Sequence, residues 1–583
     1  MMKSTSVLSA ALLLFRGASA KCYNTSIHPS VVDDVQGVTY KGLNRNGIEV
    51  FLGIPYGEDT GGANRFKRPT AYTPERGSVI TAQSYGPSCP QPTYASDPPF
   101  FYSNVTEISE DCLNLVLGRP KGTTKDSHLP VMVYIHGGSF FTGANVEVTE
   151  QPDGLVKESI QNGLPVIEVG INYRLGAFGF ANSDALQAEG STNAGLRDQR
   201  LAIEWVHDHI DQFGGDPEKI TIFGQSSGGL AIGMQIMAYG GSKPVPFSQG
   251  ICESQALEPG ITGNFTRDAM QALVDYLGCN KTELNSAETI ECLRSFDTVT
   301  LFNASSETHI SDFAHNIGDT WLPAVDGDFL PAAPSELIKQ GRFANVTTMV
   351  LWCDGDLNVF LDTSIQTNQD TYDLIQDYQP AMTSANVDKL LSLYDVSEFP
   401  ADEAAGLSSE FYRAARIVRD ILMTCQPMHY AEAIASRGNA VYLVDWNQTI
   451  SDQVIKALWN ETGFGVIHTS DLEYVFGNIS ALDPGGIPFH VSAADHALVS
   501  RGSRSWSTFA TTGSPSLDDH DTFVGFTPAF PGNDQVNVFV AGGPSEGLSP
   551  IDGPGANPAL EVQKIRERCA FINSEEIIKQ LQY

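Results

Sequence analysis

Residues 220–229 read ITIFGQSSGG, and this short stretch decides how the rest of the chain is interpreted. It contains the pattern G-x-S-x-G, in which Gly224 and Gly228 enclose Ser226. Taken alone the pattern is weak, because glycine and serine are also common in turns that only connect two elements. The stretch therefore predicts either a nucleophilic serine or an ordinary turn, and its surroundings must decide.

Apolar runs bounded by turn residues surround this stretch, at 131–135, 165–171, 220–223, 349–353 and 440–446. Runs without polar alternation are typical of strands buried on both faces, as in parallel sheets. Between the second and third runs, apolar residues recur at three-, four- and seven-residue spacings, which predicts an amphipathic helix ended by the sequence GGDP. These are Leu196, Ile203, Val206, Ile210 and Phe213. The order strand, helix, strand indicates an α/β fold with a parallel sheet.

Ser226 directly follows one of these strands and precedes a stretch rich in good helix formers. In this strand, turn, helix context, its hydroxyl is exposed at the carboxyl end of the sheet, near the positive end of a helix dipole. Side chains at Gly224 and Gly228 would collide with the neighbouring strand and helix. The context therefore favours a nucleophile.

A serine nucleophile needs a base, and it needs donors for the developing oxyanion. The stretch HGGSF begins at His136, directly after the strand 131–135. Consecutive glycines at a strand end let backbone N–H groups approach a substrate oxygen closely. Paired with the serine turn, the stretch indicates an oxyanion hole.

Eight stretches now make a resemblance specific: the chain is similar to the type-B carboxylesterase/lipase family, relatives of the cholinesterases with the α/β-hydrolase fold. They run in family order: FLGIPYGE at 51, SEDCLNLVL at 109, VYIHGGSF at 133, INYRLGAFGF at 171, NAGLRDQRLAIEWV at 193, FGGDPEKITIFGQSSGG at 213, GVIHTSDLEYVFG at 465 and SWSTFATTGSP at 505. The resemblance implies a large, mostly parallel central sheet flanked by helices, with helical insertions. It also implies one catalytic domain over residues 21–583, although the length alone suggests several domains.

The resemblance implies that Ser226 is the nucleophile and His468 the general base. The family usually has a Glu as the acid, and this chain reads VLWCDGDLNVF there. Registering on Phe360 makes Asp356 the acid, and a shift of two residues would make it Asp354. The chain order Ser, Asp, His is that of α/β-hydrolases.

The resemblance also implies that the oxyanion donors are the backbone N–H groups of Gly138, Ser139 and Ser227. Ser139 stands where a third glycine is frequent and Ser227 where alanine is frequent, but both donate through the backbone. Gln225 replaces the Glu that precedes the nucleophile in cholinesterases, which removes a negative charge near the reacting centre. We therefore expect neutral esters as substrates.

The implied reaction is ester hydrolysis through an acyl-enzyme intermediate, which requires no metal and no organic cofactor. In family members the segment that matches residues 90–111 is the flap over the active site, so the resemblance implies a flap here. Their prolines and aromatic residues indicate a mostly irregular rim, which favours a soluble-ester hydrolase. The alternatives are a triacylglycerol lipase or sterol esterase, and an adhesion or receptor-like member that has lost catalysis. His207 and His209 lie two apart on a helix and face different ways, which argues against a metal site.

The nine cysteines suit an oxidising compartment. The resemblance pairs Cys89 with Cys112 and Cys279 with Cys292, each bridge contributing on the order of 3 kcal/mol. We expect Cys252, Cys353 and Cys425 to be buried thiols. Cys22 and Cys569 could bridge the two ends of the chain, and at least one thiol is left over because nine is odd.

Several features predict a secreted, extracellular glycoprotein. Residues 1–20 combine Lys3, an apolar stretch and the sequence ASA, which predicts a signal peptide cleaved after Ala20. The polar C-terminus EEIIKQLQY predicts no membrane anchor. Nine glycosylation sequons occur, at Asn24, Asn104, Asn264, Asn280, Asn303, Asn345, Asn447, Asn460 and Asn478.

The net charge of −34 predicts the class of partner. So acidic a surface repels phosphate backbones and anionic headgroups, which argues against nucleic acid and against a peripheral membrane role. We expect a small-molecule or lipid ester as the partner, and a surface suited to an acidic medium.

Overall fold

The computed structural model describes residues 28–93, 98–316 and 320–583. The predicted signal peptide over residues 1–20, Cys22 and the sequon at Asn24 lie outside the described residues. Within the described ranges, no helix combines the length and the apolar character that a membrane span requires.

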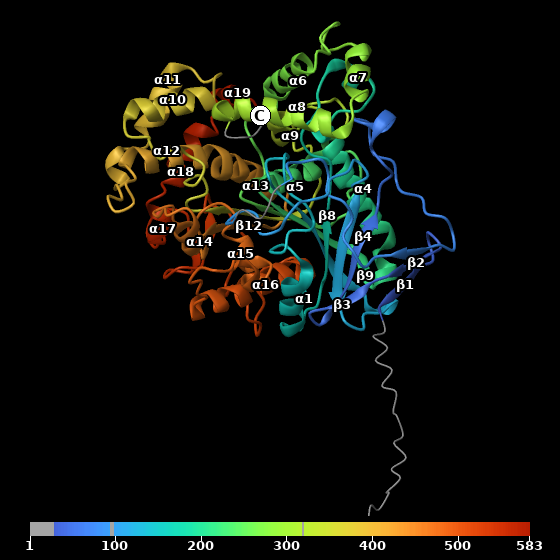
Figure 1. The fold of residues 1–583 in the computed structure, drawn as a ribbon. Helices are drawn as coiled ribbons and strands as arrows, with labels where there is room; N and C mark the ends of the chain where they lie inside the picture. Colours follow the sequence, from blue (N-terminus) through green and yellow to red (C-terminus); the bar gives the residue numbers. More distant parts are fainter. Residues whose placement is uncertain (1–27, 94–97, 317–319) are drawn as a thin grey trace, which may run out of the picture.

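An eleven-stranded sheet forms the centre of the molecule, in the order β14-β13-β12-β11-β10-β9-β7-β8-β6-β4-β3 (Figure 1). Its neighbours are parallel from β8 to β13 and antiparallel at both edges. The strands are β3 (Leu43–Arg45), β4 (Ile48–Pro55), β6 (Asn114–Pro120), β7 (Leu129–Ile135), β8 (Ile167–Ile171), β9 (Gly215–Gln225), β10 (Gln249–Glu253), β11 (Thr347–Cys353), β12 (Val441–Trp446), β13 (Asn537–Ala541) and β14 (Gly547–Pro550). A second sheet contains β1 (Ser30–Asp33), β2 (Val38–Lys41) and β5 (Val79–Thr81). The predicted α/β fold with a mostly parallel sheet is confirmed.

Helices cover both faces of the central sheet because its buried strands are apolar on both sides. Val131, Val133 and Ile135 of β7 belong to one core cluster, together with side chains of α4 (Ala194–His209), α5 (Ser227–Met237) and α13 (Gln426–Ser436). Met132 and Tyr134, which point to the opposite face, belong to another core cluster with α16 (Ala493–Thr512). The helix α1 (Pro152–Gln161) packs against α16 on that second face.

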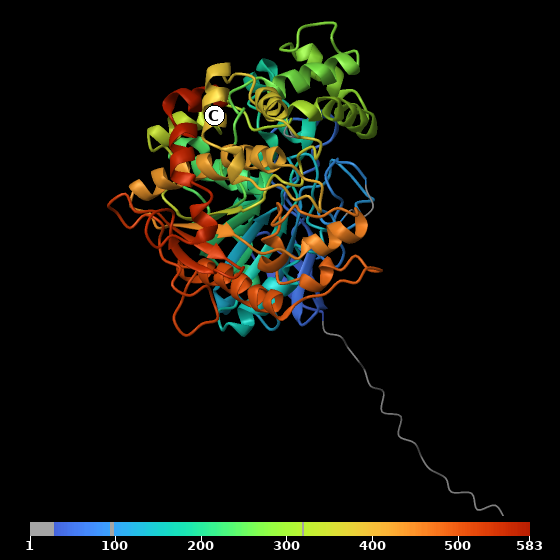
Figure 2. The ribbon, with the colours of Figure 1, turned by 90° about the vertical axis from the view of Figure 1, so that its left-hand side faces the viewer.

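Helical insertions lie beyond one end of the sheet, in the upper part of Figures 1 and 2. Those between β10 and β11 are α6 (Phe265–Tyr276), α7 (Ala287–Arg294), α8 (Thr298–Asn316) and α9 (Pro334–Lys339). Those between β11 and β12 are α10 (Asn368–Tyr378), α11 (Ser384–Ser392), α12 (Ser409–Arg419), a π-helical turn (Asp420–Cys425) and α13. The remaining helices are α2 (Gly176–Phe180), α3 (Asp184–Ala188), α14 (Ser451–Leu458), α15 (Leu472–Val475), α17 (Pro558–Glu561), α18 (Ile565–Ile572) and α19 (Glu575–Leu581).

Three disulfides cross-link the described part of the chain. Two are the pairs implied by the family resemblance, Cys89–Cys112 and Cys279–Cys292. The third joins Cys425 to Cys569, 144 residues apart, because α18 packs against the π-helical turn. Our expectation that Cys425 is a free thiol is therefore wrong, and so is the possible bridge from Cys569 to Cys22. Cys252 and Cys353 are buried and free, as expected.

Candidate active site

Ser226 occupies a sharp turn between β9 and α5. Its φ of 59° and ψ of −129° lie outside the usual regions for a residue with a side chain, so this turn holds backbone strain. A Cβ atom at Gly224 would lie 2.6 Å from the carbonyl oxygen of Ile135, and one at Gly228 would lie 2.1 Å from the same atom. The two glycines therefore let the turn pass close to the neighbouring strand β7.

Asp356 and His468 meet at the carboxyl end of the sheet. Asp356 follows β11, is fully buried, and its Oδ1 lies 2.7 Å from Nδ1 of His468. Its Oδ2 accepts a hydrogen bond of 2.7 Å from the backbone N–H of Cys353. His468 is 4% exposed and lies in the loop between α14 and α15. The carboxylate thus orients the imidazole so that Nε2 is the acceptor nitrogen of the ring.

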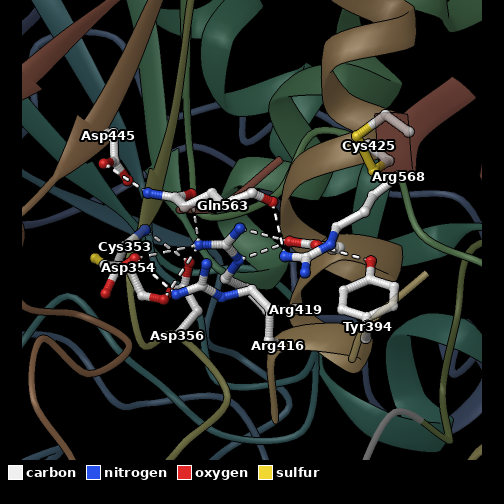
Figure 3. Close-up of polar contacts among 12 residues, drawn as sticks. Cys353, Asp354, Asp356, Tyr394, Arg416, Arg419, Cys425, Asp445, Gln563 and Arg568 are labelled. Carbon is white, nitrogen blue, oxygen red and sulfur yellow. Dashed lines mark hydrogen bonds and ion pairs between the residues drawn. A yellow bond between two sulfur atoms is a disulfide. The ribbon is translucent and has the colours of Figure 1, made fainter. Parts of the chain in front are cut away.

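Asp354 lies in the same loop, but its carboxylate faces Arg416 and Arg419, as Figure 3 shows. Its Oδ1 accepts a hydrogen bond of 2.9 Å from Arg416, and its backbone oxygen accepts one of 3.2 Å from Arg419. Of the two carboxylates that the sequence left open, the structure therefore brings Asp356 to the histidine.

The other ring nitrogen of His468 contacts Gln225. The side-chain amide nitrogen of Gln225 lies 3.1 Å from Nε2 of His468. In the part of the chain that the structure describes, no hydrogen bond joins Nε2 to the Ser226 hydroxyl. The sequence motif gave no indication of this contact.

The loop expected to supply oxyanion donors follows β7, which pairs with β9 and therefore places the loop beside Ser226. Gly138, Ser139 and Phe140 have φ values of 100°, 53° and 52°. These positive φ values make a tight turn, a backbone conformation in which successive N–H groups can line an anion-binding concavity. The backbone N–H of Phe140 donates a hydrogen bond of 3.1 Å to the hydroxyl of Ser227, which ties the loop to the start of α5.

A cavity of about 280 Å³ opens onto these residues. Ser226, Gly138, Ser139 and His468 lie on its wall. Its apolar lining includes Phe100, Phe101, Phe141, Phe360, Leu472 and Leu482. The described residues between 90 and 111 form turns and isolated bridges but no helix, as predicted for this rim. The arrangement offers an apolar pocket beside a serine, a histidine and an array of backbone donors.

Three glutamates that the sequence did not single out also line this cavity. Burial raises the pKa of Glu147, raises that of Glu473 well above its usual range, and raises that of Glu150 to about 8 with help from neighbouring Glu147. The cavity wall therefore carries less negative charge at neutral pH than its composition suggests.

Comparison with known proteins identifies the family. The model of the carboxylesterase family matches residues 26–535. The chain belongs to the carboxylesterase family. It is 52% identical to a secreted lipase of Arthroderma benhamiae, over 95% of this chain and 96% of that one. It is 34% identical to an inactive carboxylesterase-like protein of Byssochlamys spectabilis, over 94% of both chains.

The solved structure of EstA from Aspergillus niger superposes with a TM-score of 0.76 at 23% identity, covering 95% of this chain and 99% of the other. This likeness shows the α/β-hydrolase fold. Membership of the carboxylesterase family, with lipases and esterases among its relatives, makes the chain a carboxylic ester hydrolase.

The sequons of this carboxylesterase differ in their surroundings. Among the described ones, six are exposed, at Asn104, Asn264, Asn280, Asn303, Asn345 and Asn460. Asn447 and Asn478 are half-buried. The amide nitrogen of Asn478 donates hydrogen bonds to the backbone oxygens of Thr149 and Gln151, at 3.1 and 2.7 Å. A glycan on that nitrogen would leave a single N–H to make both bonds.

Proposed function

We propose that this chain is a secreted, extracellular serine hydrolase that cleaves neutral carboxylic esters through an acyl-enzyme, with residues 21–583 as one catalytic domain. The observation that carries the proposal is the 2.7 Å contact between Asp356 and His468 on the wall of the cavity that also holds Ser226. The secreted lipase of Arthroderma benhamiae, similar over nearly the whole chain, supports the location outside the cell.

The reaction has two steps. In the first, His468 takes the proton of Ser226 as the hydroxyl attacks the ester carbonyl, and the backbone N–H groups of Gly138, Ser139 and Ser227 bind the oxyanion. The alcohol then leaves with the proton held by His468. In the second step His468 takes a proton from water as the water attacks the acyl group. His468 then gives this proton to the oxygen of Ser226, whose bond to the acyl carbon breaks and releases the acid. Asp356 keeps the imidazole in the required tautomer throughout.

Two features support neutral substrates. Gln225 is uncharged, and it stands where a carboxylate would attract a cationic alcohol group. The three glutamates on the cavity wall have raised pKa values, because burial disfavours their charged forms. A choline ester therefore gains little over its neutral carbon isostere, and a comparison of kcat/KM for the two esters tests this point.

Hydrolysis of p-nitrophenyl esters of increasing acyl length tests the proposal as a whole. We expect turnover by the wild type and loss of at least about 10³ in kcat for Ser226→Ala. Equal turnover by the two proteins would contradict the assignment of Ser226. An inactive, binding-only protein would show no turnover in either form.

A second candidate function is that of a lipase acting on long-chain lipid esters. The Arthroderma benhamiae relative is described as a secreted lipase, and the aromatic and aliphatic cavity wall fits an acyl chain. Activity on a triacylglycerol that rises sharply above its solubility limit would favour the lipase. Activity that saturates below this limit would favour the soluble-ester hydrolase.

A further inference from the structure

Gln225 lies between the nucleophile turn and the histidine. It ends β9, is 2% exposed, and its amide nitrogen lies 3.1 Å from Nε2 of His468. Its side chain also packs against the oxyanion loop, since a Cβ atom at Gly137 would lie 3.3 Å from Oε1 of Gln225. The amide therefore lies between His468 and the loop that contains Gly137.

The direction of this hydrogen bond follows from the rest of the ring. Nδ1 of His468 faces the acceptor oxygen of Asp356 at 2.7 Å, so Nδ1 carries the proton in the neutral ring. Nε2 then presents a lone pair, and the amide N–H of Gln225 donates to it. This is the lone pair that must take the proton of Ser226.

We propose that Gln225 is a positioning residue that holds His468 in its neutral, Nδ1-protonated form and so extends ester hydrolysis to mildly acidic pH. The proposal rests on the proposed function, in which His468 is the base. A donor to Nε2 stabilises the neutral imidazole, because protonation of Nε2 removes the lone pair that accepts the bond. The proton of Ser226 can reach Nε2 once the amide of Gln225 rotates away.

The other charged groups near His468 define what a change at Gln225 would do. Asp356 is in direct contact, and Asp471 lies in the same loop as the histidine. Burial and the charge of Asp356 raise the pKa of Asp471 to about 7. Asp471 is therefore largely uncharged in mildly acidic solution, and Asp356 holds the imidazolium most directly.

A second layer of titratable groups lies behind this loop. Burial raises the pKa of the Glu253 carboxyl and of the Cys353 thiol well above their usual ranges, and raises that of Glu150 to about 8. These groups too are largely uncharged below pH 7. A carboxylate at position 225 would thus add a full negative charge directly against Nε2, and it would stabilise the imidazolium.

The charge of the whole molecule agrees with such a role. A net charge of −34 and an isoelectric point near 4.6 keep the surface acidic and soluble down to mildly acidic pH.

The test is the pH profile of kcat/KM for p-nitrophenyl butyrate in wild type, Gln225→Glu and Gln225→Met. We expect the acidic midpoint to move up by about one pH unit in Gln225→Glu, and by a smaller amount in the same direction in Gln225→Met, which removes the amide donor without adding a charge. One unit below the wild-type midpoint, Gln225→Glu then loses up to about tenfold more activity than the wild type. Circular dichroism checks that each variant is folded.

Gln161→Glu is the matched control, because it adds the same charge at an exposed site where Gln161 already accepts a hydrogen bond from Arg504. Its acidic midpoint should equal that of the wild type. An unchanged midpoint in folded Gln225→Glu or Gln225→Met, or an equal shift in Gln161→Glu, would overturn the proposal. Failure of the proposed function is distinguishable, because Ser226→Ala would then retain wild-type activity.

Discussion

At the scale of single residues, two serines in succession have different tasks in the proposed site. Ser226 carries the reacting hydroxyl, whereas the hydroxyl of Ser227 accepts the backbone N–H of Phe140. An alanine at this second position would leave that N–H without its hydroxyl acceptor. This hydrogen bond joins the loop of Gly138 and Ser139 to the start of α5 at Ser227. The backbone N–H groups of these three residues are the proposed oxyanion donors.

Ser227→Ala should lower kcat about fivefold with little change in KM, because one lost hydrogen bond corresponds to about 1 kcal/mol. Steady-state kinetics with a p-nitrophenyl ester measures both constants. Ser159→Ala is the control, since Ser159 is also buried but donates to Val156 within α1. A wild-type kcat in Ser227→Ala would show that the oxyanion loop does not need this bond.

Asp356→Asn should lower kcat about 10³- to 10⁴-fold, because the amide stabilises the wrong tautomer of His468. Asp354→Asn should stay within about threefold of wild type, since Asp354 contacts Arg416 instead of the histidine. The paired variants differ by two positions in one loop. The reverse ranking of their kcat values would assign the acid to Asp354.

The residues that carry a motif could be predicted from the sequence, whereas those whose contacts depend on packing could not. Ser226 and His468 stand in long family stretches, and Phe360 supplied the register for Asp356. The contact of Gln225 with His468 joins positions 243 residues apart and depends on side-chain direction, which no local pattern encodes. The Cys425–Cys569 bridge escaped for the same reason.

At the scale of elements, the C-terminal part of the chain fastens the loop that carries Asp356 (Figure 3). Arg419 of α12 donates to the backbone oxygen of Asp354 and to Gln563, and Gln563 in turn donates to Asp445 of β12. The nearby disulfide joins the π-helical turn to α18. The acid loop is thus held by elements that are distant in sequence.

Replacing Cys425 and Cys569 together by serine should lower the free energy of unfolding by about 2 to 5 kcal/mol, with kcat unchanged. Denaturant unfolding measures the loss. The same change at Cys279 and Cys292 is the control, because that bridge closes a loop of only 13 residues against 144. The longer loop should give the larger loss, and an equal or smaller loss would contradict the role given to this bridge.

Strands could be predicted from the sequence where both of their faces are buried. The five apolar runs are strands β7, β8, β9, β11 and β12, because a strand buried on both faces must be apolar throughout. β10 lies in the middle of the sheet but reads QGICE, which is too short and mixed to be distinguished from a loop. The insertion helices could not be placed individually, since their packing partners lie far away in the chain.

At the scale of the whole molecule, buried carboxyls couple stability to pH. Burial, aided by neighbouring acids, raises the pKa of Glu150 and Asp445 to about 8 and that of Asp471 to about 7. The folded state therefore keeps protons that the unfolded chain releases near pH 4. The stability from these groups is fully present below about pH 4 and is lost as the pH rises through about 7 to 8.

The melting temperature should therefore fall between about pH 5 and about pH 8, as differential scanning calorimetry would measure. Asp445→Asn should flatten this slope, because the amide keeps an oxygen for Gln563 but does not titrate. A melting temperature that rises over this range, or an unchanged slope in the variant, would show that these carboxyls do not govern stability.

The central claim is that Ser226 becomes acylated with His468 as its base. Its most direct test is inactivation by a fluorophosphonate, which forms a stable adduct with an activated serine, followed by peptide mapping. The account predicts one label per chain, on the peptide that contains Ser226, and no labelling at that position in His468→Ala. A label on a different residue that accompanies the loss of activity would contradict it.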